Sequence, residues 1–249
     1  MLLAIDVGNS AIKFGLFEGD TLTSKFSIPT NRDASADDIN GAVGDRLPRH
    51  IDSAIVCSVV PDVEDALRSF LREATVAEPI LVTNSLDFGL RITYEPLESL
   101  GTDRLVNAFA AAEKYGAPVI VCSLGTATTI DVVNADREFL GGIIAPGMDA
   151  MAEALHLKAA QLPKIDVSQP ESLIGNSTVA SIRSGVYYGY VAMVEGLLEK
   201  IQSGTAAARV VVTGGNATEV TFRGRAEVIV DPNLILDGLR LLFKSVPPA

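Results

Sequence analysis

The chain begins with three apolar stretches separated by a few polar or glycine residues: LLAIDVG (2–8), AIKFGLFEG (11–19) and TLTSKFSIPT (21–30). Short runs rich in β-branched and aromatic residues, bounded by glycine or polar residues, are typical of strands. The pair Gly19-Asp20 suits a tight turn between the second and third runs. The opening of the chain therefore predicts a meander of three antiparallel strands.

The rest of the first half alternates helical and extended patterns. A polar segment predicts a helix near residues 36–47, and SAIVCSVV (53–60) and PILVT (79–83) predict strands. From Pro61 the apolar residues recur every three or four positions, which predicts a helix: Val63, Ala66, Leu67, Phe70 and Leu71. An alanine-rich segment predicts a further helix from Leu105 to Tyr115.

The pattern then restarts with three more strand-like runs, at 118–125, 128–137 and 138–147. Helices are expected around 148–157 and 178–202, strands in ARVVVTGG (208–215) and AEVIV (226–230), and a final helix over 233–243. The long helix carries an apolar stripe that is more typical of a core than of an interface: Val186, Tyr187, Val191, Val194 and Leu198.

This restart is an internal repeat. Aligning Gly8 with Gly125 also aligns Asp6 with Ser123 and the first meander with the second. Each half is a strand meander followed by alternating helices and strands, which is an α/β pattern. We therefore predict two lobes, residues 1–116 and 117–249, with the glycine turns at their strand ends facing a cleft between them.

Composition narrows the possible partners and locations. Asp and Glu outnumber Lys and Arg by 31 to 20, which argues against a nucleic-acid partner that needs a basic face. Cys57 and Cys122 lie in apolar runs without a metal or disulfide spacing, so buried, inert thiols are expected. His50 and His156 belong to no motif and are read as structural or solvated. No run is long enough for a membrane helix and no signal-peptide pattern opens the chain, so we expect a cytoplasmic enzyme without a membrane partner.

Two strands end in turns of similar chemistry, DVGNS (6–10) and SLGTATT (123–129). Glycine allows the backbone to approach a ligand closely, and hydroxyl and N–H groups donate to phosphate oxygens. Lys13 adds a positive charge, and the Asp6 carboxylate could hold Mg²⁺ through its waters. A third glycine turn, VVTGG (211–215), suits the sugar or base of a nucleotide.

Two readings of these turns stay open. Each one, taken alone, is equally an ordinary connection between strands, and neither a Walker P-loop nor a GxGxxG fingerprint occurs in the chain. Asp103 has a similar ambiguity. It lies at the entry to a predicted helix, where an aspartate is most often a cap, but phosphoryl transfer also needs a group that accepts the proton of the attacking hydroxyl.

Several motifs, in this order along the chain, give the sequence a resemblance to the type III pantothenate kinases, also called the Bvg accessory factor family. They are DVGNS, YEPLESLGTDRLVN, SLGTATTIDVV, GGIIAPG, LPKIDV, GNSTVASIRSG, VVVTGG and NLILDGL. The resemblance implies the acetate and sugar kinase, Hsc70 and actin fold, with two ribonuclease-H-like lobes and ATP bound between them. It further implies ATP-dependent phosphorylation of pantothenate, the first step of coenzyme A synthesis, by a homodimer that needs Mg²⁺ and K⁺ or ammonium.

The resemblance also implies roles for individual residues. Gly125 and Thr126 resemble nucleotide contacts of the second loop, and the first phosphate loop is carried by Asp6, Val7, Gly8, Asn9, Ser10, Ala11, Ile12 and Lys13. Asp103 matches the general base that takes the proton of the pantothenate hydroxyl. The substrate-binding residues that it implies are Tyr94, Gly101, Thr102, Arg104, suited to the pantothenate carboxylate, and Thr178, which in the family reaches the site from the partner subunit.

One position departs from the family pattern. The second loop of the family normally begins with an aspartate that is a ligand of the monovalent cation, and here that position is Ser123. A serine hydroxyl brings no charge, so the requirement for K⁺ is in doubt unless Asp131 on the next strand compensates. Ser123 also motivates a second hypothesis, a regulator that binds nucleotide or pantothenate without turnover. A third, another small-molecule kinase on the same fold, fits Tyr94 and the GTDR motif less well.

Overall fold

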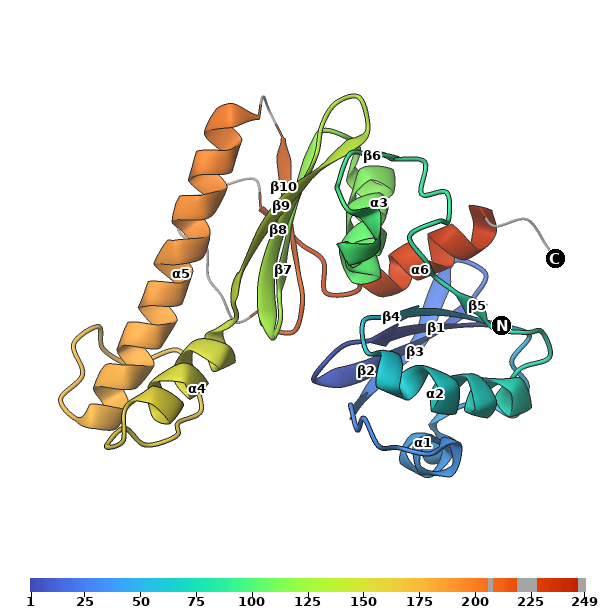
Figure 1. Cartoon of the computed structure of the whole chain (residues 1–249), viewed down its shortest axis with the longest axis horizontal. Coiled ribbons are helices and arrows are strands. Elements are labelled where there is room, and N and C mark those ends of the chain that lie inside the picture. Colours follow the sequence, from blue (N-terminus) through green and yellow to red (C-terminus); the bar gives the residue numbers. More distant parts are fainter. Residues whose placement is uncertain (206–207, 219–227, 246–249) are drawn as a thin grey trace. The chain divides into compact units, whose positions relative to one another are not determined.

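The computed structural model describes residues 1–205, 208–218 and 228–245 (Figure 1). The chain divides into two compact units, each built from more than one stretch of sequence. The first unit comprises Met1–Leu90, Tyr94–Ala110 and Asn233–Ala249, and the second comprises Arg91–Thr93 and Ala111–Pro232. The helix at the C-terminus thus belongs to the first unit, whereas the sequence repeat assigned it to the second half.

The first unit is a five-stranded sheet in the order β3-β2-β1-β4-β5. The predicted meander is confirmed, because β1 (Leu2–Val7), β2 (Ala11–Glu18) and β3 (Thr21–Pro29) pair antiparallel. Strand β4 (Ser53–Ser58) is parallel to β1, and β5 (Ile80–Leu81) is parallel to β4. The carboxyl ends of β1 and β4 therefore lie side by side at one end of the sheet.

Helices cover both faces of this sheet (Figure 1). On one face, α1 (Ala36–Val43), the short 3₁₀ helix η1 (Gly44–Arg46) and α2 (Pro61–Ala74) enclose a core with residues such as Ile5, Phe14 and Leu67. On the other face, α6 (Leu234–Ser245) packs on β1, β2 and β4. Gly15 permits this approach, since a Cβ there would lie 3.0 Å from Leu236 Cδ1. This packing is the physical reason why α6 belongs to the first unit.

The second unit is a six-stranded sheet in the order β11-β10-β7-β8-β9-β6. Strands β7 (Val119–Leu124), β8 (Ala127–Val133) and β9 (Glu138–Pro146) form the second predicted meander. Strands β10 (Arg209–Thr213) and β11 (Val228–Val230) are parallel to β7 and to each other, and residues 226–227 of the predicted last strand lie outside the described part of the chain. The two-residue strand β6 (Arg91–Ile92) pairs with β9 and was not predicted.

Two helices pack on one face of this second sheet. They are α4 (Met148–Lys158) and α5 (Thr178–Gly204). Val186, Val194 and Leu198 of α5 are buried in one cluster with Cys122 and Ile130 of the sheet. The stripe on the long helix is therefore core, as its spacing predicted.

The strand orders confirm the internal repeat. Apart from β6, the second sheet read from β9 to β11 repeats the first sheet read from β3 to β5: a meander, then two parallel strands beyond its first strand. This order is that of the ribonuclease-H-like fold, so the predicted fold class is confirmed.

Helix α3 (Thr102–Tyr115) begins within the first unit, after the 3₁₀ helix η2 (Leu97–Ser99).

Candidate active site

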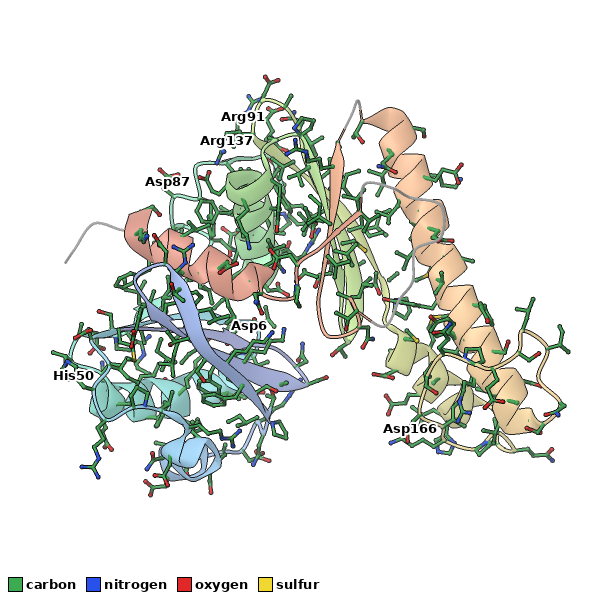
Figure 2. The ribbon with its side chains drawn as sticks, turned by 180° about the vertical axis from the view of Figure 1, so that it is seen from behind. Asp6, His50, Asp87, Arg91, Arg137 and Asp166 are labelled. Carbon is green, nitrogen blue, oxygen red and sulfur yellow. The ribbon has the colours of Figure 1, made fainter. Side chains whose placement is uncertain are left out.

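The first element of the site is a buried carboxylate at the end of β1. Asp6 is only 4% exposed and lies in register with Lys13 of β2 on one side and with Cys57 of β4 on the other (Figure 2). Lys13 Nζ donates to Asp6 Oδ2 at 2.9 Å. Lys13 itself is 42% exposed, so its ammonium group can move toward a ligand while Asp6 stays in place.

The turn after Asp6 is hydrogen-bonded to residues that directly follow β3. Thr30 Oγ1 donates to the Gly8 carbonyl at 2.6 Å, and the Thr30 N–H donates to the Ser10 carbonyl at 3.1 Å. Arg32 donates to Asn9 Oδ1 at 3.0 Å, which leaves the amide N–H₂ of Asn9 as the group that faces away from Arg32. Sequence reasoning missed Thr30 and Arg32, although the antiparallel pairing of β2 with β3 already brings Pro29 opposite Ala11.

The GTDR motif is attached to the end of β4. Thr102 Oγ1 donates to the Ser58 carbonyl at 3.1 Å and accepts from Cys57 Sγ at 3.3 Å. Because α3 begins at Thr102, three residues earlier than predicted, Asp103 lies inside its first turn. The Asp103 carboxylate accepts from the Arg104 N–H at 2.9 Å and folds back over Gly101, where a Cβ would lie 2.5 Å from Asp103 Oδ1. Glycine at 101 is therefore what gives this carboxylate its position.

Arg104 and Tyr94, two of the expected substrate residues, lie together in the first unit. The Arg104 guanidinium carbon is 5.4 Å from the centre of the Tyr94 ring, within the range of a cation–π contact. Arg104 is only 5% exposed. A buried guanidinium with a planar aromatic partner is well suited to bind a carboxylate in two-point fashion.

Both acidic residues of this region act on the Cys57 thiol. Its pKa is raised well above 9.0, first by burial and then by the negative charge of Asp6, with a smaller contribution from Asp103. The hydrogen bond with Thr102 and the positive charge of Lys13 act in the opposite direction. The register and the hydrogen bonds place these groups at the ends of β1 and β4: Asp6 is in register with Cys57, Lys13 donates to Asp6, and Thr102 accepts from Cys57.

In the second unit, three glycine turns converge after β7. Gly147 donates to the Thr126 carbonyl at 3.1 Å, and a Cβ at 147 would lie 2.1 Å from the Gly125 carbonyl oxygen. Gly214, with φ +97°, lies so close to β7 that a Cβ there would be 2.4 Å from the Leu124 carbonyl oxygen. The VVTGG turn therefore adjoins the GTATT turn, and only glycines at 147 and 214 allow the backbones to approach this closely.

The direction of Asp131 follows from the strand register. Ser123 pairs with Thr129 and Val121 pairs with Asp131, so Ser123 and Asp131 project from the same face of the sheet, two register positions apart. Cys122 and Ile130 project from the opposite face, toward α5. Asp131 is 2% exposed, and its charge adds to burial in raising the pKa of Cys122 to about 12. The second unit therefore has a buried acid next to the position where the family pattern places one.

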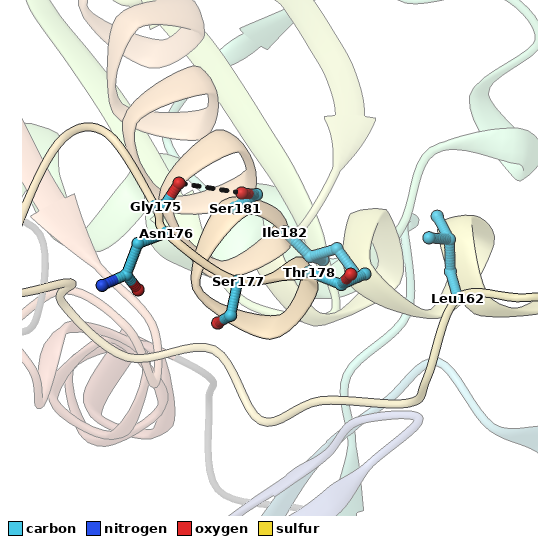
Figure 3. Close-up of a pocket in the computed structure, with 7 residues that line it drawn as sticks. All are labelled: Leu162, Gly175, Asn176, Ser177, Thr178, Ser181 and Ile182. Atoms are coloured by element: carbon cyan, nitrogen blue, oxygen red, sulfur yellow. Dashed lines mark hydrogen bonds between the residues drawn. The ribbon is translucent and has the colours of Figure 1, made fainter.

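Thr178 is the first residue of α5 and lines a cavity of about 620 Å³ (Figure 3). Ser177 Oγ caps the helix by accepting from the Ala180 N–H at 3.2 Å. Ser181 Oγ donates to the Gly175 carbonyl at 3.3 Å, and this bond holds the loop before α5 against the helix. Polar and apolar residues both line the cavity: Leu162, Gly175, Asn176, Ser177, Thr178, Ser181 and Ile182.

Sequence comparison identifies the family. Residues 2–200 match the family model described as type III pantothenate kinase. The type III pantothenate kinase of Roseiflexus sp. (strain RS-1) is 39% identical over 252 residues, which cover 98% of each chain. That of Listeria monocytogenes serotype 4a (strain HCC23) is 37% identical over 255 residues, which cover 100% of this chain and 98% of the relative. The chain belongs to the type III pantothenate kinase family.

Structural similarity agrees on the fold. A ROK family glucokinase from Streptomyces griseus, solved with glucose and AMPPNP, has a TM-score of 0.55 at 12% identity, with 97% of this chain and 98% of that chain covered. The chain thus shares the actin-like ATPase and sugar kinase fold. Membership of a kinase family favours catalysis over the regulator hypothesis that Ser123 had motivated.

The residues that the sequence predicted for the site occur in both compact units. Asp6, Lys13, Tyr94, Thr102 and Asp103 are all in the first unit, and Gly125, Thr126 and Thr178 are in the second. Within the described residues, no group of three or more His, Cys, Asp or Glu side chains could hold a metal ion, and no helix is long and apolar enough to cross a membrane. The two histidines have local partners, Asp52 for His50 at 3.0 Å and the Leu162 carbonyl for His156 at 2.8 Å.

The two thiols of this pantothenate kinase are expected to be unreactive in the native protein. Both are fully buried, and burial is the largest cause of their raised pKa values, so neither forms appreciable thiolate near pH 8. Titration with an aromatic disulfide reagent should give no colour from the native protein and a response from both cysteines in guanidinium chloride. A Val76→Cys variant, at a position 74% exposed, is the positive control. Rapid native reaction of the unaltered protein would contradict the burial of Cys57 or Cys122.

Proposed function

We propose that this type III pantothenate kinase transfers the γ-phosphoryl group of ATP to the primary hydroxyl of pantothenate, with Asp103 as the proton acceptor. The observation that carries the proposal is the position of Asp103, in the first turn of α3 beside the buried Arg104 and next to Thr102, which is hydrogen-bonded to the end of β4. In the reaction, the hydroxyl oxygen forms a bond to the γ-phosphorus, the bond to the β,γ-bridging oxygen breaks, and the hydroxyl proton passes to the Asp103 carboxylate.

The two matched turns are proposed to hold the ATP phosphates. Asn9, Ser10 and Thr126 are exposed in turns that backbone hydrogen bonds hold in place, so a phosphate group can approach these turns from solvent. Lys13 would add a charge to this contact. The donor set at Asp6 fits Mg²⁺ held through water, because the described residues bring no group of three or more acidic, His or Cys side chains together to ligate the ion directly. When bound there, Mg²⁺ would neutralise phosphate charge.

The acceptor substrate is proposed to lie along the start of α3. Arg104 would bind the carboxylate of pantothenate, with its guanidinium plane supported by Tyr94. Gly101 and Thr102 would keep Asp103 at the hydroxyl end, since Gly101 admits the folded carboxylate and Thr102 ties the turn to β4. Holding both ends of the acceptor orients its hydroxyl for attack, which is where a positioning enzyme gains most of its rate.

We propose that the rate of this reaction depends less on K⁺ or ammonium than it does in relatives with an aspartate at the position of Ser123. Asp131 is the only acid that the described strand register places on the face of Ser123 next to the GTATT turn. A carboxylate introduced at 123 would lie close to the one at 131, and a bound cation would relieve their repulsion.

A Ser123→Asp variant is therefore expected to show several-fold greater stimulation by K⁺ or ammonium over Na⁺ than the unaltered enzyme. The measurement is the rate of pantothenate-dependent ADP release in each chloride salt at constant ionic strength. Ser123→Asn, which has a similar shape without the charge, should behave like the unaltered enzyme. Identical cation profiles for all three proteins would exclude position 123 from the cation site.

Homodimerisation is a further part of the proposal. Thr178 is exposed on α5, and large apolar side chains on and before this helix are exposed in the single chain, among them Leu157, Leu173 and Ile174. A second copy covering this surface would bury them and could bring Thr178 to its substrate site. Two domains at residues 1–116 and 117–249 and a cytoplasmic location remain predictions.

The test of the proposed function is ADP release by the purified protein with ATP and Mg²⁺, measured with and without pantothenate. Pantothenate-dependent release, with phosphorylated pantothenate found by mass spectrometry, is the expected result. ATP binding without pantothenate-dependent ADP release, in K⁺, ammonium and Na⁺ alike, would refute the proposal. That result would favour the hypothesis that the protein is a regulator.

A further inference from the structure

Asn107 of α3 carries a buried acceptor that the fold does not use. It is 6% exposed, and among the described residues no group donates a hydrogen bond to its Oδ1. Its neighbours on the helix are the buried apolar residues Val106 and Ala108. A buried amide oxygen without a donor is costly, because it loses its hydrogen bonds to water and gains none in return.

The place of Asn107 on the helix connects this oxygen with the proposed acceptor site. At 3.6 residues per turn, Asn107 lies about 40° around the helix from Asp103 and about 60° from Arg104, between them and one turn further along. Its Cβ is therefore a neighbour of both, as residues three and four positions apart are. Val106 and Ala110 of the same helix have a packing partner, since they meet α6 at Gly238, where a Cβ would lie 2.9 Å from Val106 Cγ1 and 2.8 Å from Ala110 Cβ.

The other buried side-chain atoms without partners lie outside α3, although Asn84 lines a cavity of about 370 Å³ together with Thr102. They are Asn84 Oδ1, Arg183 Nε and Arg240 Nε, and within the described part of the chain each belongs to a side chain in a different element from Asp103 and Arg104. The side chain of Asn84 also has a structural task, because its Nδ2 donates to the Leu97 and Leu100 carbonyls at 2.7 and 2.9 Å. Asn107 alone combines an unused acceptor with a position between the two residues proposed to hold the ends of the acceptor substrate.

We propose that Asn107 is a further substrate-positioning residue whose Oδ1 accepts a hydrogen bond from a donor in the middle of the acceptor substrate. This inference rests on the proposed function, because it takes Asp103 to lie at the hydroxyl end and Arg104 at the carboxylate end. Pantothenate has two donors between these ends, its amide N–H and its secondary hydroxyl, and one of them would fill the vacant hydrogen bond of Asn107.

The first experiment replaces Asn107 with leucine, which has a similar size and no polar atom. We expect the KM for pantothenate to rise roughly tenfold or more, since one hydrogen bond to a buried acceptor is lost, while the KM for ATP stays within twofold. The melting temperature should stay unchanged or rise, because the unpaired oxygen is gone. Asn40→Leu, the same exchange at an exposed position of α1, should leave both KM values unchanged.

The second experiment identifies the donor without altering the enzyme. Two analogues are compared with pantothenate, one with an ester in place of the amide and one without the secondary hydroxyl. The unaltered kinase should discriminate roughly tenfold against the analogue that lacks the bonded donor, and Asn107→Leu should no longer discriminate against it.

The outcomes separate the inference from the function on which it rests. If the unaltered protein phosphorylates pantothenate but accepts both analogues as well as pantothenate, the inference is wrong and the proposed function stands; this holds even if Asn107→Leu fails to fold. An unchanged pantothenate KM in a folded Asn107→Leu protein would overturn it equally, by showing that the amide is only an unsatisfied packing residue or bonded to water. Absence of pantothenate turnover in the unaltered protein would overturn both.

Discussion

Replacing Asp103 with asparagine is expected to reduce pantothenate-dependent turnover by about 10²–10⁴-fold, the range typical of a lost general base. The amide keeps the shape of the carboxylate and can still accept the Arg104 N–H that Asp103 accepts at 2.9 Å. It cannot take up the hydroxyl proton. The measurement is kcat from ADP release at saturating ATP and pantothenate, together with the melting temperature.

The same variant decides between the two readings of Asp103. An acid in the first turn of a helix stabilises it by about 0.3–1 kcal/mol through the helix dipole, so a purely structural Asp103 would cost stability and leave turnover nearly intact. Asp37→Asn, in the first turn of α1, is the matched control and should lower stability by a similar amount without changing turnover. Near wild-type kcat in a folded Asp103→Asn protein would remove Asp103 from the reaction.

Replacing Asp6 with asparagine is expected to reduce kcat by about 10²–10³-fold, comparable with the loss of one preorganised electrostatic contact in other enzymes. The reason is the position of Asp6, buried at the end of β1 with Lys13 Nζ at 2.9 Å. The substitution removes the charge proposed to hold Mg²⁺ and leaves Lys13 without its counter-charge. A titration of turnover against Mg²⁺ should show that the variant needs a higher concentration for half-maximal rate.

Asp52→Asn provides the comparison for this effect. Asp52 also pairs with a positive group, the N-terminal amine, and with His50. It is exposed, however, and lies just before the first residue of β4, whereas the candidate site lies at the last residues of this strand. Loss of an exposed ion pair has little effect, so this variant should retain its kcat and its Mg²⁺ dependence. If Asp6→Asn behaved like Asp52→Asn, Asp6 would have no part in phosphate or metal binding.

Most of the fold follows from the sequence because its elements have a strong periodicity. The meanders and the α5 stripe were predictable from alternating or helical apolar spacing, and the repeat fixed their order. The two-residue strand β6 was not predictable, since its pairing with β9 is a tertiary contact that no local pattern announces. The start of α3 at Thr102 was missed because the apolar pattern begins only at Leu105, whereas hydrogen bonds to the Gly101 carbonyl begin the helix.

The candidate site shows the same division. Asp6, Lys13 and Asp103 stand in recognisable motifs, and the structure places them within the first unit. Thr30, Arg32 and Asn107 do not, because their importance comes from hydrogen bonds made or left unmade in three dimensions. A polar residue inside the apolar run LVNAFAAA was the one available signal for Asn107.

The membership of α6 in the first unit has a consequence for how the chain is made. A ribosome delivers residues from the N-terminus onward, so β1, β2 and β4 emerge long before Leu236 and Leu239, the buried side chains of the helix that covers them. Throughout synthesis of the second unit, one apolar face of the first sheet has no cover. The first unit can complete its fold only after residues 234–245 have left the ribosome, so this unit is finished later than the second unit, although its first strands are made earlier.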